Sequence, residues 1–212
     1  MAIYIKDEAF VLKVKTFKEE DAIVSLFTKN YGKIFGIIKK FKTSKKNIYI
    51  FDQLNFIKAF FVIKNRKIKI ISGLVLDEIK IPRENFKNWL WTFKVLNNFT
   101  IKEKAEKEIF NFLILCSRVL TKKLRGYKTW FLIKMLQITG FFIFDIFCFN
   151  CSNAISEGFF NNGIFCKNCQ KKGVKIKRDD IIQIKKIADS NFPLFTSKKI
   201  VSILKNILKN LT

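Results

Sequence analysis

Apolar and polar residues alternate in short runs through the first third of the chain. Charged or glycine-containing turns at residues 18–21, 30–32 and 64–66 separate runs rich in β-branched and aromatic residues, a pattern typical of strands. A polar, basic loop is expected at residues 43–47. Five short strands in about 70 residues are best accommodated by an OB-type barrel. The predicted strands cover residues 9–17, 22–28, 33–42, 55–63 and 67–76.

The period of the apolar positions changes after Pro82, where Phe86, Leu90 and Phe93 begin a helical spacing. Helices are predicted over residues 86–99, 102–124, 127–139, 179–190 and 197–211. The predicted fold class is therefore α+β and multidomain. The expected parts are an OB-fold domain at 1–79, a helical domain at 80–147 and 175–212, and a loop-rich module at 148–174.

Two CxxC pairs, Cys148/Cys151 and Cys166/Cys169, lie 14 residues apart. Two such pairs bring four thiolates around one ion, and Zn²⁺ accepts this tetrahedral set. Four protein ligands leave no open position for water, so one structural zinc ion is expected. Phe159, Phe160, Ile164 and Phe165 are expected to pack around it, and base stacking is the alternative role for any of them that are exposed.

Other interpretations of the cysteines are an iron–sulfur centre, disulfides and unliganded thiols. Zinc is favoured over all three, because free cysteines seldom fall into two such pairs and disulfides are rare inside cells. Cys116 stands alone in an apolar helical pattern and is expected to be buried.

The chain carries 41 basic and 17 acidic residues, a net charge of +24. This balance predicts attraction to DNA, RNA or an anionic membrane. Only five basic residues are Arg, and the abundance of Lys, Ile, Phe and Asn is typical of an A+T-rich genome, so part of the charge reflects composition. The chain has no His, which removes the commonest general base and makes an enzyme improbable.

No apolar run reaches the roughly 18 residues of a membrane span, and no signal peptide is recognisable. A cytoplasmic, nucleoid-associated bacterial protein without membrane contact is expected. Aromatic residues and Lys alternate along the predicted barrel, as in proteins that bind single strands. For each of Phe17, Tyr31, Phe35, Phe41 and Tyr49 a place in the core is nevertheless favoured over base stacking. The predicted DNA contacts are Lys13, Lys15, Lys33, Lys39, Lys40, Lys42, Lys45 and Lys46, and the cluster from 39 to 46 is expected to dominate.

Two segments together resemble the RecO family. The first is the strand pair from Phe17 to Thr28 with its Glu19-x-Asp21 turn, followed by Gly32-Lys33. The second is the helix from Leu132 to Gly140 leading into the four cysteines. The likeness covers about residues 5–175. Lys18 and Lys40 stand where the family often has Gly, and Ala22 stands where it often has a basic residue.

The resemblance implies an OB barrel, a helical domain and a zinc module in a protein that binds single- and double-stranded DNA and anneals complementary strands. It implies that the protein acts together with RecR and helps to load RecA onto strands coated by single-stranded-DNA-binding protein (SSB). It further implies a basic surface for the acidic C-terminal tail of SSB. The residues expected there are Arg118, Lys122, Lys123 and Arg125.

Two other functions fit the same sequence. An RNA-binding protein with a zinc ribbon and an OB fold would use the same charge and strands. A nuclease would need paired carboxylates for Mg²⁺, and the available candidates are Glu19, Glu20 and Asp21 in one turn and Asp179–Asp180 at a helix start. Both groups are interpreted as structural.

Overall fold

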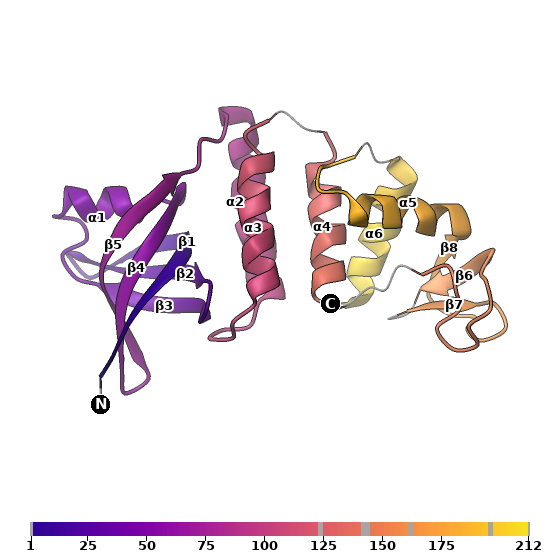
Figure 1. The fold of residues 1–212 in the computed structure, drawn as a ribbon, viewed down its shortest axis with the longest axis horizontal. Helices are drawn as coiled ribbons and strands as arrows, with labels where there is room; N and C mark the ends of the chain where they lie inside the picture. Colours follow the sequence, from indigo (N-terminus) through magenta and orange to yellow (C-terminus); the bar gives the residue numbers. More distant parts are fainter. Residues whose placement is uncertain (1, 123–124, 141–144, 161–162, 195–196, 212) are drawn as a thin grey trace. The chain divides into compact units, whose positions relative to one another are not determined.

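The computed structural model, shown in Figure 1, describes residues 2–122, 125–140, 145–160, 163–194 and 197–211. Its contacts divide the chain into two compact units, a first unit of residues 1–123 and a second unit of residues 124–212. The boundaries expected at residues 79, 147 and 174 stay predictions.

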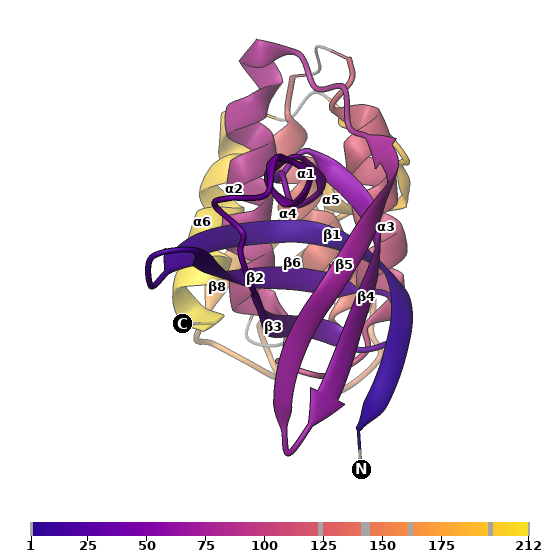
Figure 2. The same ribbon diagram turned by 90° about the vertical axis from the view of Figure 1, so that its left-hand side faces the viewer.

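The first unit contains a sheet of five strands in which every strand pairs with two others. Its order is β1-β2-β3-β5-β4, and β1 pairs with both β2 and β4. All pairings are antiparallel except that of β3 with β5, which joins Ile37 to Lys69 and Ile38 to Ile70. Figure 2 shows β4 and β5 running across β1, β2 and β3. The bounds are Ile3–Phe17 (β1), Asp21–Thr28 (β2), Gly32–Ile38 (β3), Asn55–Lys64 (β4) and Lys67–Glu78 (β5).

Alternation along the strands produces two apolar layers. Inward side chains such as Val11, Leu26 and Phe61 form the buried core of the sheet. Outward Phe10 lies 5.4 Å from Phe110 and 6.0 Å from Trp89, measured between ring centroids. These contacts place α2 (Arg83–Phe99) and α3 (Lys107–Val119) in the same compact unit as the sheet.

The structure corrects two expected elements of the first unit. The third strand was expected to reach residue 42 but ends at Ile38. Part of the expected loop at 43–47 instead begins the short helix α1 (Lys45–Ile50), because the Ser44 hydroxyl caps this helix by accepting the Asn47 N–H at 3.2 Å. The helix expected from residue 102 begins only at Lys107. The backbone of Lys102 forms an isolated parallel β-bridge with that of Lys33, and Glu103 has a positive φ, so neither residue is helical.

The second unit combines three helices with a small sheet. Trp130 of α4 is fully buried and donates its indole N–H to the Ser190 carbonyl at 2.9 Å. The short strands were not expected in a module predicted to be loop-rich. They are antiparallel in the order β7-β6-β8. The bounds are Tyr127–Ile138 (α4), Glu157–Phe160 (β6), Ile164–Cys166 (β7), Val174–Lys177 (β8), Arg178–Asp189 (α5) and Lys198–Leu211 (α6).

The described residues thus form a mixed α+β protein with one five-stranded sheet, one three-stranded sheet and six helices. Among these helices, none combines the length and the apolar character that crossing a membrane requires.

Candidate metal centre and nucleic-acid interface

The four cysteines of the two CxxC pairs converge in the second unit. Their Sγ atoms all lie within 4.8 Å of one another, and the Sγ atoms of Cys151 and Cys166 are 3.8 Å apart. A tetrahedral site with zinc–sulfur bonds of about 2.3 Å has sulfur–sulfur edges of about 3.8 Å. The donor set and its spacing therefore fit a metal ion of this kind.

Each pair lies in a tight turn stabilised by the backbone. The Ser152 N–H donates to the Cys148 carbonyl at 2.9 Å, and the Gln170 N–H donates to the Cys166 carbonyl at 3.0 Å. The Cys166 N–H donates to Cys148 Sγ at 3.3 Å, and the Asn150 amide donates to Cys169 Sγ at 3.6 Å. Such donors stabilise negative charge on sulfur, which metal binding requires.

The local environment shifts the pKa values of Cys148 and Cys169 in opposite directions. Burial opposes ionisation of Cys148, but hydrogen bonds from the backbone at Cys151, Cys166 and Asn150 lower its pKa to about 6. The Asn150 amide favours the Cys169 thiolate, whereas bonding to Cys151 and Cys166 and burial together raise the pKa of Cys169 to about 12. Four adjacent thiolates repel one another, so the set needs a cation at its centre to be fully ionised.

Outward side chains of β1, β2 and β3 form a basic and partly apolar surface, here called the β1–β3 face. The β1–β2 register shifts between Val11 and Lys13, so Lys13 and Lys15 both point outward beyond the part covered by the helices. Lys13 lies opposite Ser25, which lies opposite Phe35, and Phe35 is 42% exposed. The face consists of Lys13, Lys15, Phe17, Ile23, Phe35 and Ile37.

A pocket of about 550 Å³ lies at one side of the β1–β3 face. It is lined by Lys13 and Phe35 of the sheet and by Leu90, Phe93 and Lys94 of α2. The exposed Lys94 adds a cation that the sequence reasoning missed. The sequence did not reveal this cation, because the spacing of apolar residues in a helix does not show which strands the helix packs beside.

Lys33 is buried, unlike the other predicted DNA contacts. Its residue is only 7% exposed, and its ammonium donates to the backbone and side-chain oxygens of Asn97 and to the Thr100 carbonyl. Burial lowers its pKa, and the charge of Glu106 opposes this shift. These acceptors occupy the ammonium, so Lys33 is unavailable to a phosphate in this structure.

The predicted cluster from residue 39 to 46 is partly occupied by acidic partners. Lys39 pairs with Asp21 at 2.6 Å, and the Lys40 N–H donates to the same carboxylate at 3.2 Å. Lys42 lines a hollow together with the acidic turn at Glu19 and Glu20. The remaining lysines of the cluster are exposed on α1 or beside it. They are Lys40, Lys45 and Lys46.

The expectation that five aromatic residues lie in the core is wrong for four of them. Phe41 is buried with the sheet core. The others are between 38% and 55% exposed. These exposed residues are Phe17, Tyr31, Phe35 and Tyr49.

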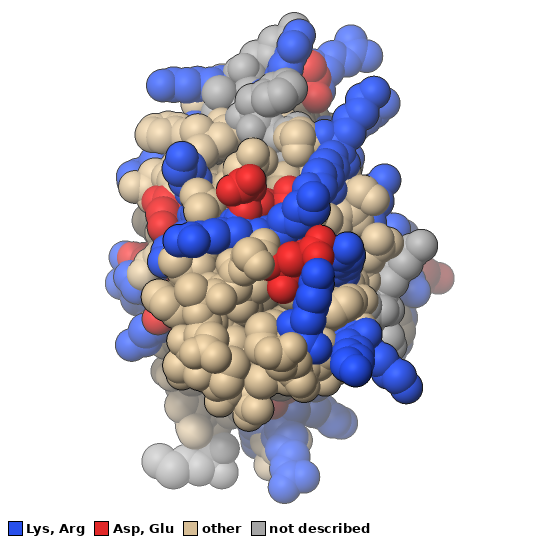
Figure 3. Space-filling model, turned by 90° about the vertical axis from the view of Figure 1, so that its right-hand side faces the viewer, with Lys and Arg blue, Asp and Glu red and all other residues tan. Residues whose placement is uncertain are grey.

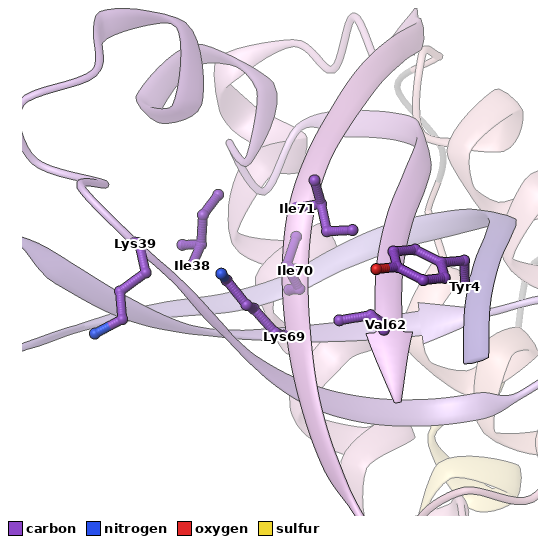
Figure 4. A pocket seen from close by; sticks show the side chains of 7 residues that line it. All are labelled: Tyr4, Ile38, Lys39, Val62, Lys69, Ile70 and Ile71. Carbon is purple, nitrogen blue, oxygen red and sulfur yellow. The ribbon is translucent and has the colours of Figure 1, made fainter. Parts of the chain in front are cut away.

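A second pocket, of about 350 Å³, lies where β3 meets β5 (Figure 4). Figure 4 shows Lys69 reaching from β5 toward Ile38, with Val62 and Tyr4 on the other side of β5. Lys69 lies opposite Ile37, so it continues the β1–β3 face around the sheet. Lys69 was missed because this parallel pairing is not visible in the sequence.

The four residues expected to meet the SSB tail fall on both sides of the unit boundary. Arg118 is exposed in the last turn of α3, and Lys122 is exposed with its carbonyl accepting the Asn85 amide at 2.8 Å. Arg125 is exposed in the second unit, and Lys123 lies outside the described residues.

Over the face drawn in Figure 3, Lys and Arg project widely and the acidic side chains lie close to them.

The carboxylates considered for Mg²⁺ serve local structure. Hydrogen bonding by Lys39 is the main cause that lowers the pKa of Asp21. Asp180 accepts the Lys177 N–H at the start of α5 and pairs with Lys199 at 2.7 Å. Asp21 and Asp180, one from each group, are therefore each paired with a lysine.

The fold and the cysteines define a mixed α+β protein with a strongly basic sheet domain and a candidate metal module. Residues 1–78 match the family model described as "Recombination protein O N terminal". The chain is 26% identical over 146 residues to DNA repair protein RecO of Prosthecochloris aestuarii, which covers 65% of this chain and 55% of that protein. The protein of the same name from Syntrophus aciditrophicus is 27% identical over 146 residues, covering 64% and 56%.

A third relative, DNA repair protein RecO of Rickettsia africae, is 42% identical over 53 residues, covering 25% of this chain and 22% of that protein. Over these matched segments the chain is similar to RecO proteins. Its matches span about half or less of the length of these curated relatives.

Proposed function

We propose that the chain is a non-enzymatic mediator of DNA repair and recombination. It binds single- and double-stranded DNA, anneals complementary strands and helps to load recombinase onto SSB-coated strands. The curated relatives carry the name DNA repair protein. The observation that carries the proposal is the β1–β3 face, where Lys13 and exposed Phe35 lie in one row with Ser25 between them and Lys15 lies in the next row.

The five-stranded sheet is proposed to be an OB-type barrel occupying residues 1–79. Every strand has two pairing neighbours, as closure requires, and proteins of this fold bind oligonucleotides on the strand 2–3 side. Phosphates follow Lys13, Lys15, Lys40, Lys45 and Lys46, while Phe35 stacks on a base. Lys33 is left out because its ammonium is buried and bonded.

Annealing in this proposal is electrostatic and involves no turnover. Two strands repel one another, and lysines that neutralise their phosphates lower this repulsion while releasing counterions. The net charge of +24 supplies the required excess of cations. Binding and annealing should therefore weaken steeply with salt.

The metal is proposed to be one structural Zn²⁺ held by Cys148, Cys151, Cys166 and Cys169. Zinc supplies four bonds that fix the two turns, and its filled coordination leaves no position for catalysis. Residues 148–174 are proposed to form the zinc module, and residues 80–147 and 175–212 are proposed to form the helical domain.

Two protein partners are proposed, RecR and the acidic tail of SSB, with action at the nucleoid in the cytoplasm. Exposed Arg118, Lys122 and Arg125 supply cations for the tail, together with Lys123. Reversing all four charges should weaken binding of an SSB-tail peptide at least tenfold. An unchanged affinity would remove these residues from the proposed tail site.

The direct test of the DNA surface compares Lys13→Ala/Lys15→Ala with Lys102→Ala/Lys107→Ala, a control that removes the same charge from exposed positions elsewhere in the first unit. Affinity for a single-stranded oligonucleotide is measured over a salt series. Each lost phosphate contact should reduce the slope of log affinity against log salt by about 0.7. Equal slopes in the two variants would contradict the proposed surface, and preferential displacement by structured RNA would favour an RNA-binding function.

A further inference from the structure

The three-stranded sheet of the second unit has one buried side and one open side. Phe160, Ile164 and Ile176 are buried. On the other side, Phe165 of β7 lies opposite Phe159 of β6, which lies opposite Lys175 of β8. Side chains directly opposite one another on neighbouring strands are in contact distance, so two aromatic rings and a lysine form a row across the sheet.

Phe149 adds a third aromatic ring to this row. Its ring centroid lies 5.8 Å from that of Phe165 at an interplanar angle of 70°, and its N–H donates to the Ile164 carbonyl at 2.8 Å. Its side chain is nevertheless 66% exposed. Phe149 stands between Cys148 and Asn150 in the first CxxC turn, and its backbone bond to Ile164 places it at the rim of the sheet.

The surroundings of these rings are strongly basic. Glu157 is the only acidic residue between 148 and 178 in the sequence, and it pairs with Lys167 at 2.5 Å and with Lys175 at 2.9 Å. Hydrogen bonds from Lys167 and then Lys175 lower the pKa of Glu157 to about 2. Lys177 lies opposite Glu157, and further exposed cations follow at Lys171 and Lys172.

We propose that this module face is a second binding site, specific for single-stranded nucleic acid. The face consists of Phe149, Phe159, Phe165, Lys167, Lys175 and Lys177. Bases stack on the exposed ring of Phe149 and the edge of Phe165, and phosphates follow the lysines. The inference rests on the proposed function and deepens it, since one chain with two sites can hold the two strands that it anneals.

Charge and ring exposure together select this occupant. Single strands are bound by aromatic rings that stack on bases within a positively charged groove, and stacking tolerates any base sequence. A duplex hides the faces of its bases, so the rings give it no comparable contact. An acidic peptide would use the lysines but would gain little from Phe149.

The test uses the full metal-loaded chain and a short oligothymidine, with the binding stoichiometry measured by titration and the contact site by ultraviolet cross-linking. The wild type should bind two oligonucleotides and cross-link within the peptide that contains Phe149. Phe149→Ala should weaken one of the two sites roughly 5- to 150-fold, the range expected for one lost stacking contact. Phe192→Ala, which removes a 53% exposed ring elsewhere in the second unit, should leave both sites unchanged.

Further variants separate this inference from the proposed function. Lys13→Ala/Lys15→Ala should weaken the other site and spare the cross-link at Phe149, and Glu157→Gln should strengthen the module site at low salt. A single site that responds only to Lys13→Ala/Lys15→Ala would overturn the module face and leave the proposed function intact. Binding that responds to neither variant would overturn both, and an acidic peptide that binds the module face more tightly than oligothymidine would replace nucleic acid as its occupant. Metal content, measured for every variant, identifies any loss that comes from an unfolded module.

Discussion

The buried ammonium of Lys33 joins β3 to the end of α2. It bonds carbonyl oxygens of Asn97 and Thr100, at the helix end where positive charge is favoured. Lys33→Met keeps the aliphatic part and leaves these acceptors unpaired, so we expect it to lower the free energy of unfolding by about 1–3 kcal/mol. Urea denaturation of the variant measures this loss. Lys13→Met, at an exposed position, is the control, and equal stability of the two variants would contradict the structural role.

Lys40 adopts a left-handed backbone conformation with φ of 52°. This conformation costs a residue with a side chain roughly 1–2 kcal/mol, and glycine adopts it freely. Lys40→Gly should therefore raise the free energy of unfolding by about 0.5–1 kcal/mol, because the hydrogen bond from its N–H to Asp21 is retained. Lys42→Gly, where φ is not positive, should instead destabilise the protein. Denaturant unfolding of both variants measures these changes. If both variants were destabilised, the strain assigned to the backbone of Lys40 would be contradicted.

At the scale of elements, the turn between β2 and β3 is held against the segment that precedes α3. Gly32 has φ of 64°, and an added Cβ would lie 1.8 Å from the Lys104 carbonyl oxygen. Gly140 has a similar φ of 72° with no atom within 4 Å of an added Cβ. Gly140→Ala should cost about 1–2 kcal/mol for its backbone alone, and Gly32→Ala should cost several kcal/mol more. If the two variants lost equal free energy of unfolding in denaturant, the close contact with Lys104 would not contribute to the cost of Gly32→Ala.

The metal module should depend on its ion far more than the five-stranded sheet does. Strands β6, β7 and β8 are only three or four residues long, so their own buried area is small and metal binding supplies much of their stability. Removing the metal with a chelator should abolish hydrogen-exchange protection of the β6–β8 amides and leave that of the β1–β5 amides unchanged. Retained protection in a chain shown to be metal-free would contradict a structural role for the ion.

At the scale of the whole molecule, the sequence predicted the features that depend on local pattern. Period-2 alternation located five strands, and the CxxC spacing predicted that Cys148, Cys151, Cys166 and Cys169 would meet. It did not predict that Lys33 is buried or that Phe35 is exposed. Both depend on which row of the sheet α2 and α3 cover and on the register shift after Val11, and these are long-range packing outcomes.

The short strands β6–β8 were missed for a related reason. A strand of three or four residues is too short to show alternation, so residues 148–170 resembled a loop. The row of Phe149, Phe159 and Phe165 appears only when β6 and β7 pair. A surface assembled by pairing cannot be deduced from spacing alone.

In the proposed function, the chain anneals strands through a basic protein surface. Its most direct test is annealing of two complementary DNA strands precoated with SSB, over a salt series, with the wild type and with Lys13→Ala/Lys15→Ala. We expect the wild type to accelerate annealing by an amount that falls as salt rises, and we expect a smaller acceleration by the variant at every salt concentration. Tight DNA binding without acceleration at any salt concentration would contradict the proposed function.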